Sequence, residues 1–173
     1  MMIAMGKKEY VAAAASALNK AAAKARTKAT RHLAATYNIK PQRLVRRRMK
    51  LWRANKRKLI AKLHMLTTGM PLILLAGVDD RTASKGGVGT AHGPYDQGWI
   101  MPSKLGRRRK QIFIRKTSSR LPIESQWVKM DLEQCQSVIG MYVRAESVGV
   151  MPELARQVAM RMNGQIGGFR GAR

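Results

Sequence analysis

Small and apolar residues recur at helical spacing near the start of the chain. From Lys7 to Tyr37 there is no Gly or Pro, and Ala, the best helix former, dominates. This pattern predicts one long helix, which the sequence from Asn38 to Pro41 would end. Its apolar line contains Val11, Ala14 or Ala15, Leu18, Ala21 or Ala22, Ala25, Ala29 and Leu33. Because alanine buries little area, this helix needs a partner surface to be stable.

A second helix and two strands are predicted after it. Pro41 can occupy a first helical position, and the pattern predicts a short basic helix over residues 41–52. Over residues 58–65 the positions of Leu and Met alternate with mostly polar ones, and this period of two predicts a strand with one buried face. The apolar run 71–76 is bounded by glycines, which predicts a buried strand.

The next part of the chain combines a glycine-rich segment with two further strands. Residues 77–98 are rich in Gly, Ser, Thr and Asp and predict a long mobile loop. Residues 98–101 and 111–115 predict two strands joined by a basic turn, and residues 120–123 predict an extended segment because the residue before Pro avoids helix.

Two amphipathic helices are predicted to close the fold. Residues 131–147 carry one apolar line, Gly149 can stop this helix, and Pro152 can open another that runs through Met162. Together the elements predict an α+β fold with a long N-terminal helix, a small antiparallel sheet and C-terminal helices packed on the sheet. The predicted organisation is a basic helical region over 1–57, one compact domain over 58–163 and a flexible Gly-rich tail over 164–173.

Charge is distributed very unevenly along the chain. The 173 residues include 34 Lys and Arg but 9 Asp and Glu, a formal net charge of +25. Residues 1–65 carry 18 basic residues and one acid, residues 66–130 carry 11 and 4, and residues 131–173 carry 5 and 4. Because self-repulsion at this charge works against a compact monomer, we expect a polyanion, an acidic protein or an oligomer to complete its stability.

The basic residues form three groups that are candidates for facing DNA or an acidic partner. Each group has two interpretations, a solvated surface or a surface turned to phosphates or acidic side chains. Beside the second group, Trp52 suits stacking, and its alternative role is to anchor the helix to the core. The candidates are Lys20, Lys24, Lys28 and Arg31 on the long helix, Arg43, Arg46, Arg47, Arg48, Lys50 and Arg53 on and after the second helix, and Arg107, Arg108, Arg109 and Lys110 in the basic turn.

Cysteine, histidine and acidic residues are too few or too scattered for the common catalytic and metal sites. Cys135 is the single cysteine and falls on an apolar helical line, which favours a small hydrophobe over a nucleophile. The Gly-rich run 86–89 lacks the Lys-Ser/Thr end of a phosphate loop. The apolar run 70–78 is half as long as a membrane span requires. We therefore expect no catalytic residues, no cofactor, no metal and no membrane partner.

The order of these elements and several short segments resemble the lambda-type prophage minor tail protein Z family of tail completion proteins. The likeness spans most of residues 8–163 as a pattern of small, basic and apolar positions. It is carried by Ala17–Lys20, Tyr37–Lys40, Leu44–Arg48, Gly98–Met101, Ile112–Arg115 and Arg120–Ile123.

The resemblance implies a structural protein of the virion at the head-proximal end of the tail, and a place in the host cytoplasm during assembly. It implies a ring of identical copies, as a hexamer, around the channel through which genomic DNA passes. The implied partners are the tail terminator, the tube and the connector, with genomic DNA as a further candidate. The composition alone favours an alternative, a basic nucleic-acid-binding module of the ribosomal or nucleoid type, although no motif of such modules is present. A nuclease or helicase is a third and remote alternative.

Overall fold

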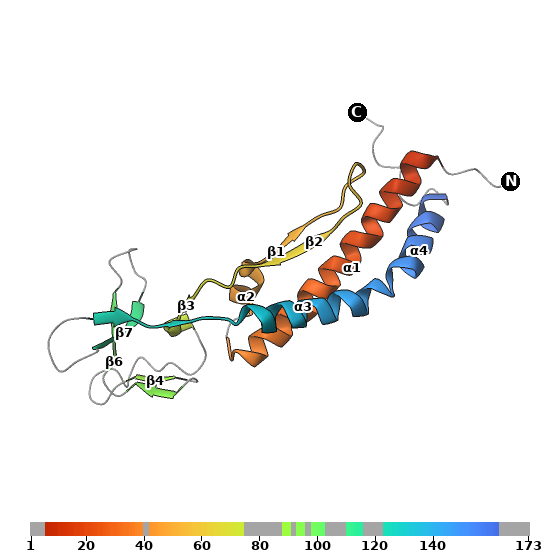
Figure 1. Cartoon of the computed structure of the whole chain (residues 1–173). Coiled ribbons are helices and arrows are strands. Elements are labelled where there is room, and N and C mark those ends of the chain that lie inside the picture. The colour runs from red at the N-terminus through yellow and green to blue at the C-terminus, as the bar shows by residue number, and fades with distance from the viewer. Residues whose placement is uncertain are drawn as a thin grey trace. The chain divides into compact units, whose positions relative to one another are not determined.

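The computed structural model describes residues 6–39, 42–74, 88–90, 93–95, 98–102, 110–115 and 123–162 (Figure 1). The chain forms two compact units, each assembled from segments that are distant in sequence. The first contains α1 up to Thr30, the segment Met49–Leu66 and the chain from Gln136 onward, and the second contains Arg31–Arg48 and Thr67–Cys135. The predicted α+β class is confirmed, with one long helix, several small antiparallel sheets and two closing helices. The boundaries predicted at residues 57 and 163 stay predictions.

The first unit is built around helix α1 (Lys7–Thr36), which confirms the predicted long helix. Its alanines leave room for neighbouring backbones to approach, and Ala13, Ala17, Ala25 and Ala29 are all buried. The predicted apolar line included two of these four; Ala13 and Ala17 extend the buried surface onto an adjacent row of the helix. Because the buried side chains are so small, this packing depends on close backbone approach more than on side-chain volume.

A two-stranded hairpin lies on one side of α1 in the first unit. Strand β1 (Met49–Trp52) pairs antiparallel with β2 (Lys62–Met65), with Met49 opposite Met65. The amide of Asn19 in α1 holds the chain after β1 twice, because its Nδ2 donates to the Ala54 carbonyl at 2.9 Å and its Oδ1 accepts from the Ala54 N–H at 2.8 Å. An isolated hairpin is marginally stable in water, so these contacts with α1, together with the buried Met49 and Met65, hold it in place.

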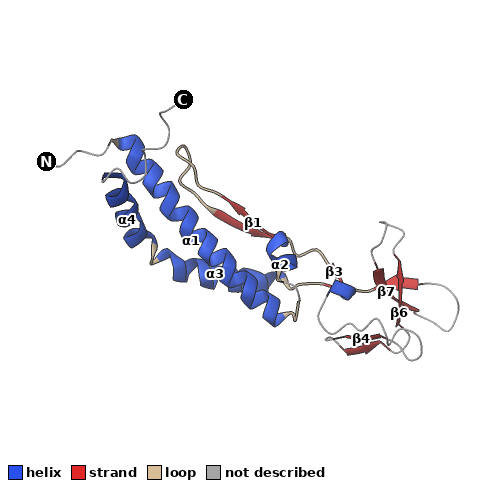
Figure 2. Ribbon diagram, turned by 180° about the vertical axis from the view of Figure 1, so that it is seen from behind, coloured by secondary structure: helices blue, strands red, loops and turns tan. Residues whose placement is uncertain are grey.

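The two closing helices are found as predicted. Helix α3 (Leu132–Ser147) is capped by Asp131, whose Oδ2 accepts from the Gln134 N–H at 3.0 Å, and α4 (Val150–Met162) begins just after Gly149. Helices α1 and α4 lie side by side in both views of the molecule (Figures 1 and 2). Polar contacts join the two helices, from Lys20 to Glu153 at 2.8 Å and from Ser16 to Gln157 at 3.3 Å.

The second unit contains the remaining short elements. They are α2 (Arg43–Arg48), β3 (Met70–Pro71), the 3-10 turn η1 (Leu72–Leu74), β4 (Val88–Thr90), β5 (Gly93–Tyr95), β6 (Gly98–Pro102), β7 (Lys110–Arg115), β8 (Ile123–Ser125) and β9 (Trp127–Val128). The sheets are antiparallel, with the orders β3-β9, β4-β5 and β6-β7-β8. The predicted pair of strands around residues 98–101 and 111–115 is confirmed as β6 and β7.

Four predicted elements differ from the structure. The second helix ends at Arg48 because residues 49–52 alternate between covered and exposed positions and pair with β2. The strand predicted over 58–65 is confined to Lys62–Met65, since Leu59 and Ile60 are both largely exposed. The run 71–76 turns into a 3-10 helix after Pro71, and the segment predicted as a loop contains the hairpin β4-β5. The basic turn 103–109 and the tail 164–173 lie outside the described residues.

Helix α1 ends in a Schellman motif around Asn38. The Ile39 N–H donates to the Ala34 carbonyl at 2.8 Å and the Asn38 N–H donates to the Ala35 carbonyl at 3.1 Å. Asn38 has a φ of 48°, the left-handed conformation that glycine and asparagine adopt most readily. Ile39 is buried, so the motif also directs an apolar side chain into the second unit.

The conformation of Asn38 predicts opposite effects for two substitutions. Asn38→Ala should lower the free energy of unfolding by about 1 kcal/mol, because a Cβ without a local hydrogen-bonding group disfavours positive φ. Asn38→Gly should leave it unchanged or raise it. Urea unfolding followed by far-ultraviolet circular dichroism measures both, and equal effects of Ala and Gly would contradict the assignment.

Candidate nucleic-acid interface

Two of the basic residues predicted on α1 are paired with carboxylates of the C-terminal helices. Lys20 Nζ lies 2.8 Å from Glu153 Oε1, and Lys28 Nζ lies 2.6 Å from Glu146 Oε1. Lys24 is exposed between them, with no ion pair within the part of the chain that the structure describes. One face of α1 is therefore partly neutralised from within the chain, and the prediction that these lysines face DNA or an acidic partner stays a prediction.

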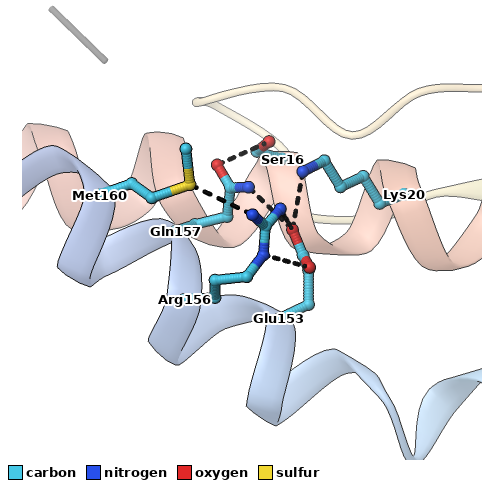
Figure 3. A network of polar contacts seen from close by, with 6 residues as sticks. All are labelled: Ser16, Lys20, Glu153, Arg156, Gln157 and Met160. Atoms are coloured by element: carbon cyan, nitrogen blue, oxygen red, sulfur yellow. Dashed lines mark hydrogen bonds and ion pairs between the residues drawn. The ribbon is translucent and has the colours of Figure 1, made fainter. Parts of the chain in front are cut away.

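Glu153 is the centre of a polar network between α1 and α4 (Figure 3). Its carboxylate accepts hydrogen bonds from Arg156, Lys20 and Gln157 at 2.8–3.0 Å. These donors, Arg156 foremost, hold the pKa of the Glu153 carboxyl well below its usual range. The Gln157 side chain is buried and is satisfied at both ends, since its Oε1 accepts from Ser16 Oγ at 3.3 Å. The network fixes Lys20 against α4, so Lys20 is a structural residue as well as a surface cation.

The arginines of α2 divide into exposed and structural residues. Arg43, Arg46 and Arg47 are exposed. Arg48 is half-buried, and its guanidinium donates to the Thr68 carbonyl, to Thr68 Oγ1 at 2.9 Å and to the Gly69 carbonyl at 3.0 Å. Burial lowers the pKa of Arg48. Three hydrogen bonds tie α2 to the chain before β3, so Arg48 serves the fold of the second unit.

The outer face of the β1-β2 hairpin gathers exposed cations around an aromatic stack. Lys50 and Trp52 of β1 and Lys62 and His64 of β2 are exposed, while Met49, Leu51, Leu63 and Met65 on the other face are buried or half-buried. The rings of Trp52 and His64 stack with centroids 5.8 Å apart and an interplanar angle of 17°. We call these four exposed side chains the hairpin outer face. Trp52 thus points away from the covered side of the hairpin and does not anchor a core.

A cavity of about 630 Å³ in the first unit has a basic lining. Its walls come from α1, from the chain that follows β1, and from α4, and it contains Lys20, Arg53, Lys56 and Arg161. No acidic residue is among the described residues that line it. The Arg161 Nε is buried and has no hydrogen-bond partner among the residues that the structure describes. Lys20 and Arg53, which the sequence predicted separately, are brought together here.

The structure places most, but not all, of the predicted candidates. Lys20, Lys24, Lys28 and Arg31 lie exposed on α1, Lys50 lies on β1, and Arg53 follows it. Lys110 begins β7, and Arg107, Arg108 and Arg109 lie outside the described residues.

Sequence reasoning missed four basic residues of the first unit. Lys62 and His64 were present in the alternation of residues 58–65, which could have identified them as one exposed face with Lys50. Lys56 lies in a stretch without any acid, from residue 10 to residue 78, and this was a usable signal. Arg161 carries no signal in the sequence, because only the packing of α4 on α1 brings it to the cavity.

Among the described residues, no group of three or more His, Cys, Asp or Glu residues could hold a metal ion. Within the same residues, no helix combines the length and apolar character that crossing a bilayer requires. Cys135 is fully buried, and burial raises the pKa of its thiol, which agrees with its predicted role as a small hydrophobe.

Comparison with known proteins identifies a family that the chain matches. The model of a family described as prophage minor tail protein Z (GPZ) matches residues 4–134. The matched range includes α1, α2, the hairpin and all the strands of the second unit, and it ends soon after α3 begins. Searches of curated proteins and of solved structures found no significant match.

The network of Glu153 predicts a pH-dependent stability. The folded pKa of this carboxyl lies below its ordinary value of 4.5, so the stabilisation is present above that pH and is lost as the pH falls through the folded pKa. Glu153→Gln should therefore lower Tm near pH 7, and its difference from the unchanged protein should shrink as the pH falls below 4.5. Thermal unfolding followed by circular dichroism across this range measures the difference. Glu9→Gln, at an exposed position on α1, is the control; the same pH-dependent loss in both variants would contradict the role of the network.

The two roles of the α2 arginines can be separated by neutralising them singly. Arg48→Gln should lower the free energy of unfolding by about 1.5–3 kcal/mol, because three carbonyl or hydroxyl oxygens lose a charged donor. Arg47→Gln, next to it but exposed, should change it by less than about 0.5 kcal/mol. Urea unfolding measures both variants. Equal losses would show that Arg48 contributes no more than surface charge.

Proposed function

The chain belongs to the prophage minor tail protein Z family, a family of phage tail proteins, and we propose that it is a structural protein of the head-proximal tail end. In this proposal it completes the tail as a ring of identical copies, six in number, around the DNA channel. Its partners are the tail terminator, the tube and the connector, and it performs no catalysis. The observation that carries the proposal is that a member of this family has exposed cations on the hairpin outer face with no ion pair within the described chain.

The distribution of charge supports a position beside DNA. The stretch from residue 10 to residue 78 contains no acid, and the acids of the C-terminal helices neutralise only part of α1. On the hairpin outer face, Lys50 and Lys62 have no ion pair within the described chain. A surface of this kind is stabilised by phosphates, whose counterions are released on contact.

Exposed apolar side chains support contacts between copies. Val148 and Met151, at the junction of α3 and α4, are 80% and 69% exposed. Met141 on α3 is 48% exposed. Exposed apolar side chains of this kind are what a repeated protein contact can bury.

The test is to count the protein in particles and to remove it from them. Purified phage should contain the chain in about six copies, a closed ring, as measured by quantitative mass spectrometry. Disruption of its gene should leave DNA-filled heads and tails that fail to join productively, and the unchanged gene supplied in trans should restore infective particles. The variant Arg43→Gln/Arg47→Gln should lower infectivity while the protein still enters particles, because both arginines are exposed.

Two outcomes would contradict this function. One is a copy number that scales with tail length, which would place the chain along the tube. The other is absence from particles together with tight binding to cellular nucleic acid, which would favour the alternative of a ribosomal or nucleoid-type module. The exposed cations of the hairpin are the observation that favours testing this nucleic-acid-binding alternative as well.

A further inference from the structure

The hairpin outer face combines two features that single-stranded nucleic acid requires. Trp52 and His64 form a planar stack, and Lys50 and Lys62 lie directly across the hairpin from them, Lys50 opposite His64 and Trp52 opposite Lys62. All four side chains are exposed. The two rings, Trp52 and His64, therefore lie on one diagonal of the hairpin, and the two lysines lie on the other.

The stack leaves ring surface unused. Trp52 is 56% exposed even though His64 covers part of it. Covering the rest of this indole would be favourable, since an aromatic side chain has a large apolar surface. Because the ring is already held flat against His64, little conformational entropy remains to be lost when a second planar group stacks on it.

The charges around the stack favour a polyanion over a second copy of the chain. Arg53, Lys56, Arg57 and Lys58 follow β1 in sequence, and the hairpin carries no acid at all. Each copy has 34 basic and 9 acidic residues, and Glu146 and Glu153 are already paired with α1. A second copy thus has little negative charge to offer this face.

The aromatic stack distinguishes unpaired bases from a duplex. In duplex DNA the bases are stacked on each other and present only their edges in the grooves, so an indole face has nothing to stack on. An unpaired base offers a planar face to any aromatic ring, whatever its sequence. Arg53, the residue after Trp52, is exposed and adds a further cation close to the stack in sequence.

We propose that the hairpin outer face binds single-stranded DNA, with one base stacked on Trp52 and the neighbouring phosphates held by Lys50 and Lys62. The choice of DNA over RNA rests on the proposed function at the DNA channel. The preference for unpaired bases rests on the geometry of the hairpin alone.

The test is the affinity of the purified full-length protein for a fluorescently labelled oligo-dT strand of about 16 nucleotides, measured by anisotropy. The strand should bind more tightly than a duplex of the same length. Trp52→Ala should weaken strand binding by about 5- to 150-fold, the loss expected for one base–aromatic stack, and change duplex binding by less than about 2-fold. Trp52→Phe should retain most of the affinity, because a smaller ring still stacks.

The contribution of Lys50 and Lys62 should appear in how strand affinity depends on salt concentration. Each of Lys50→Gln and Lys62→Gln should reduce the slope of log affinity against log salt concentration by about 0.7, the value for one phosphate of a single strand. Trp127→Phe is the matched control, since this second exposed tryptophan lies in the other unit and its Nε1 donates to Ser125 Oγ. Circular dichroism of every variant verifies that the helices are intact.

Three results would overturn the proposal. They are equal or tighter binding of the duplex, equal loss of strand and duplex binding in Trp52→Ala with the fold intact, and tighter binding of an RNA strand of the same base sequence. None of these depends on where the protein lies in the particle. If particles contain about six copies but the purified protein binds duplex more tightly than the strand, only the proposal of strand binding is refuted. If the protein prefers the strand but is absent from particles, only the proposed function is refuted.

Discussion

The structure of the first unit depends on two carboxylates that bring the nearly neutral end of the chain onto its cationic beginning. Glu146 and Glu153 pair with Lys28 and Lys20, about two turns apart along α1. A chain with a net charge of +25 has few acids to place, and two of them are used at this contact. The alanine face of α1 gives little buried area for each residue, so the ion pairs and the two hydrogen bonds between Asn19 and Ala54 help to set the positions of the neighbouring elements.

Because the chain has few acidic residues, their positions determine where positive charge stays unpaired. Once α4 and the end of α3 cover one side of α1, the hairpin on its other side keeps all its cations. The chain belongs to a minor tail protein family, and a tail protein contacts other proteins of the tail. The hairpin outer face is the one place in the described structure where such charge surrounds a stacked aromatic pair.

Sequence periodicity predicted the long elements well and the short ones poorly. Helices α1, α3 and α4 and the pair β6-β7 were predicted because each repeats its pattern over several turns or residues. The basic segment after Pro41 reads as a continuous helix, and only pairing with β2 across a gap of nine residues turns Met49–Trp52 into a strand. Likewise, the sequence could suggest that Lys20 and Lys28 face acids, but their partners lie more than a hundred residues away. Arg48 looks like its neighbours in sequence, and only Thr68 and Gly69 make it structural.

Opposite charges hold α1 to α4, whereas like charges crowd the hairpin, and dissolved ions act on these two arrangements in contrary ways. Near physiological ionic strength the Debye length is about 8 Å, so added electrolyte weakens the attraction and relieves the repulsion over the same range. In the folded state, the weaker ion pairs and the weaker repulsion between hairpin cations offset each other. In binding to an anionic surface, screening only weakens an attraction. A moderate rise in salt concentration should therefore weaken binding of this protein to an anionic surface at an ionic strength at which it is still folded.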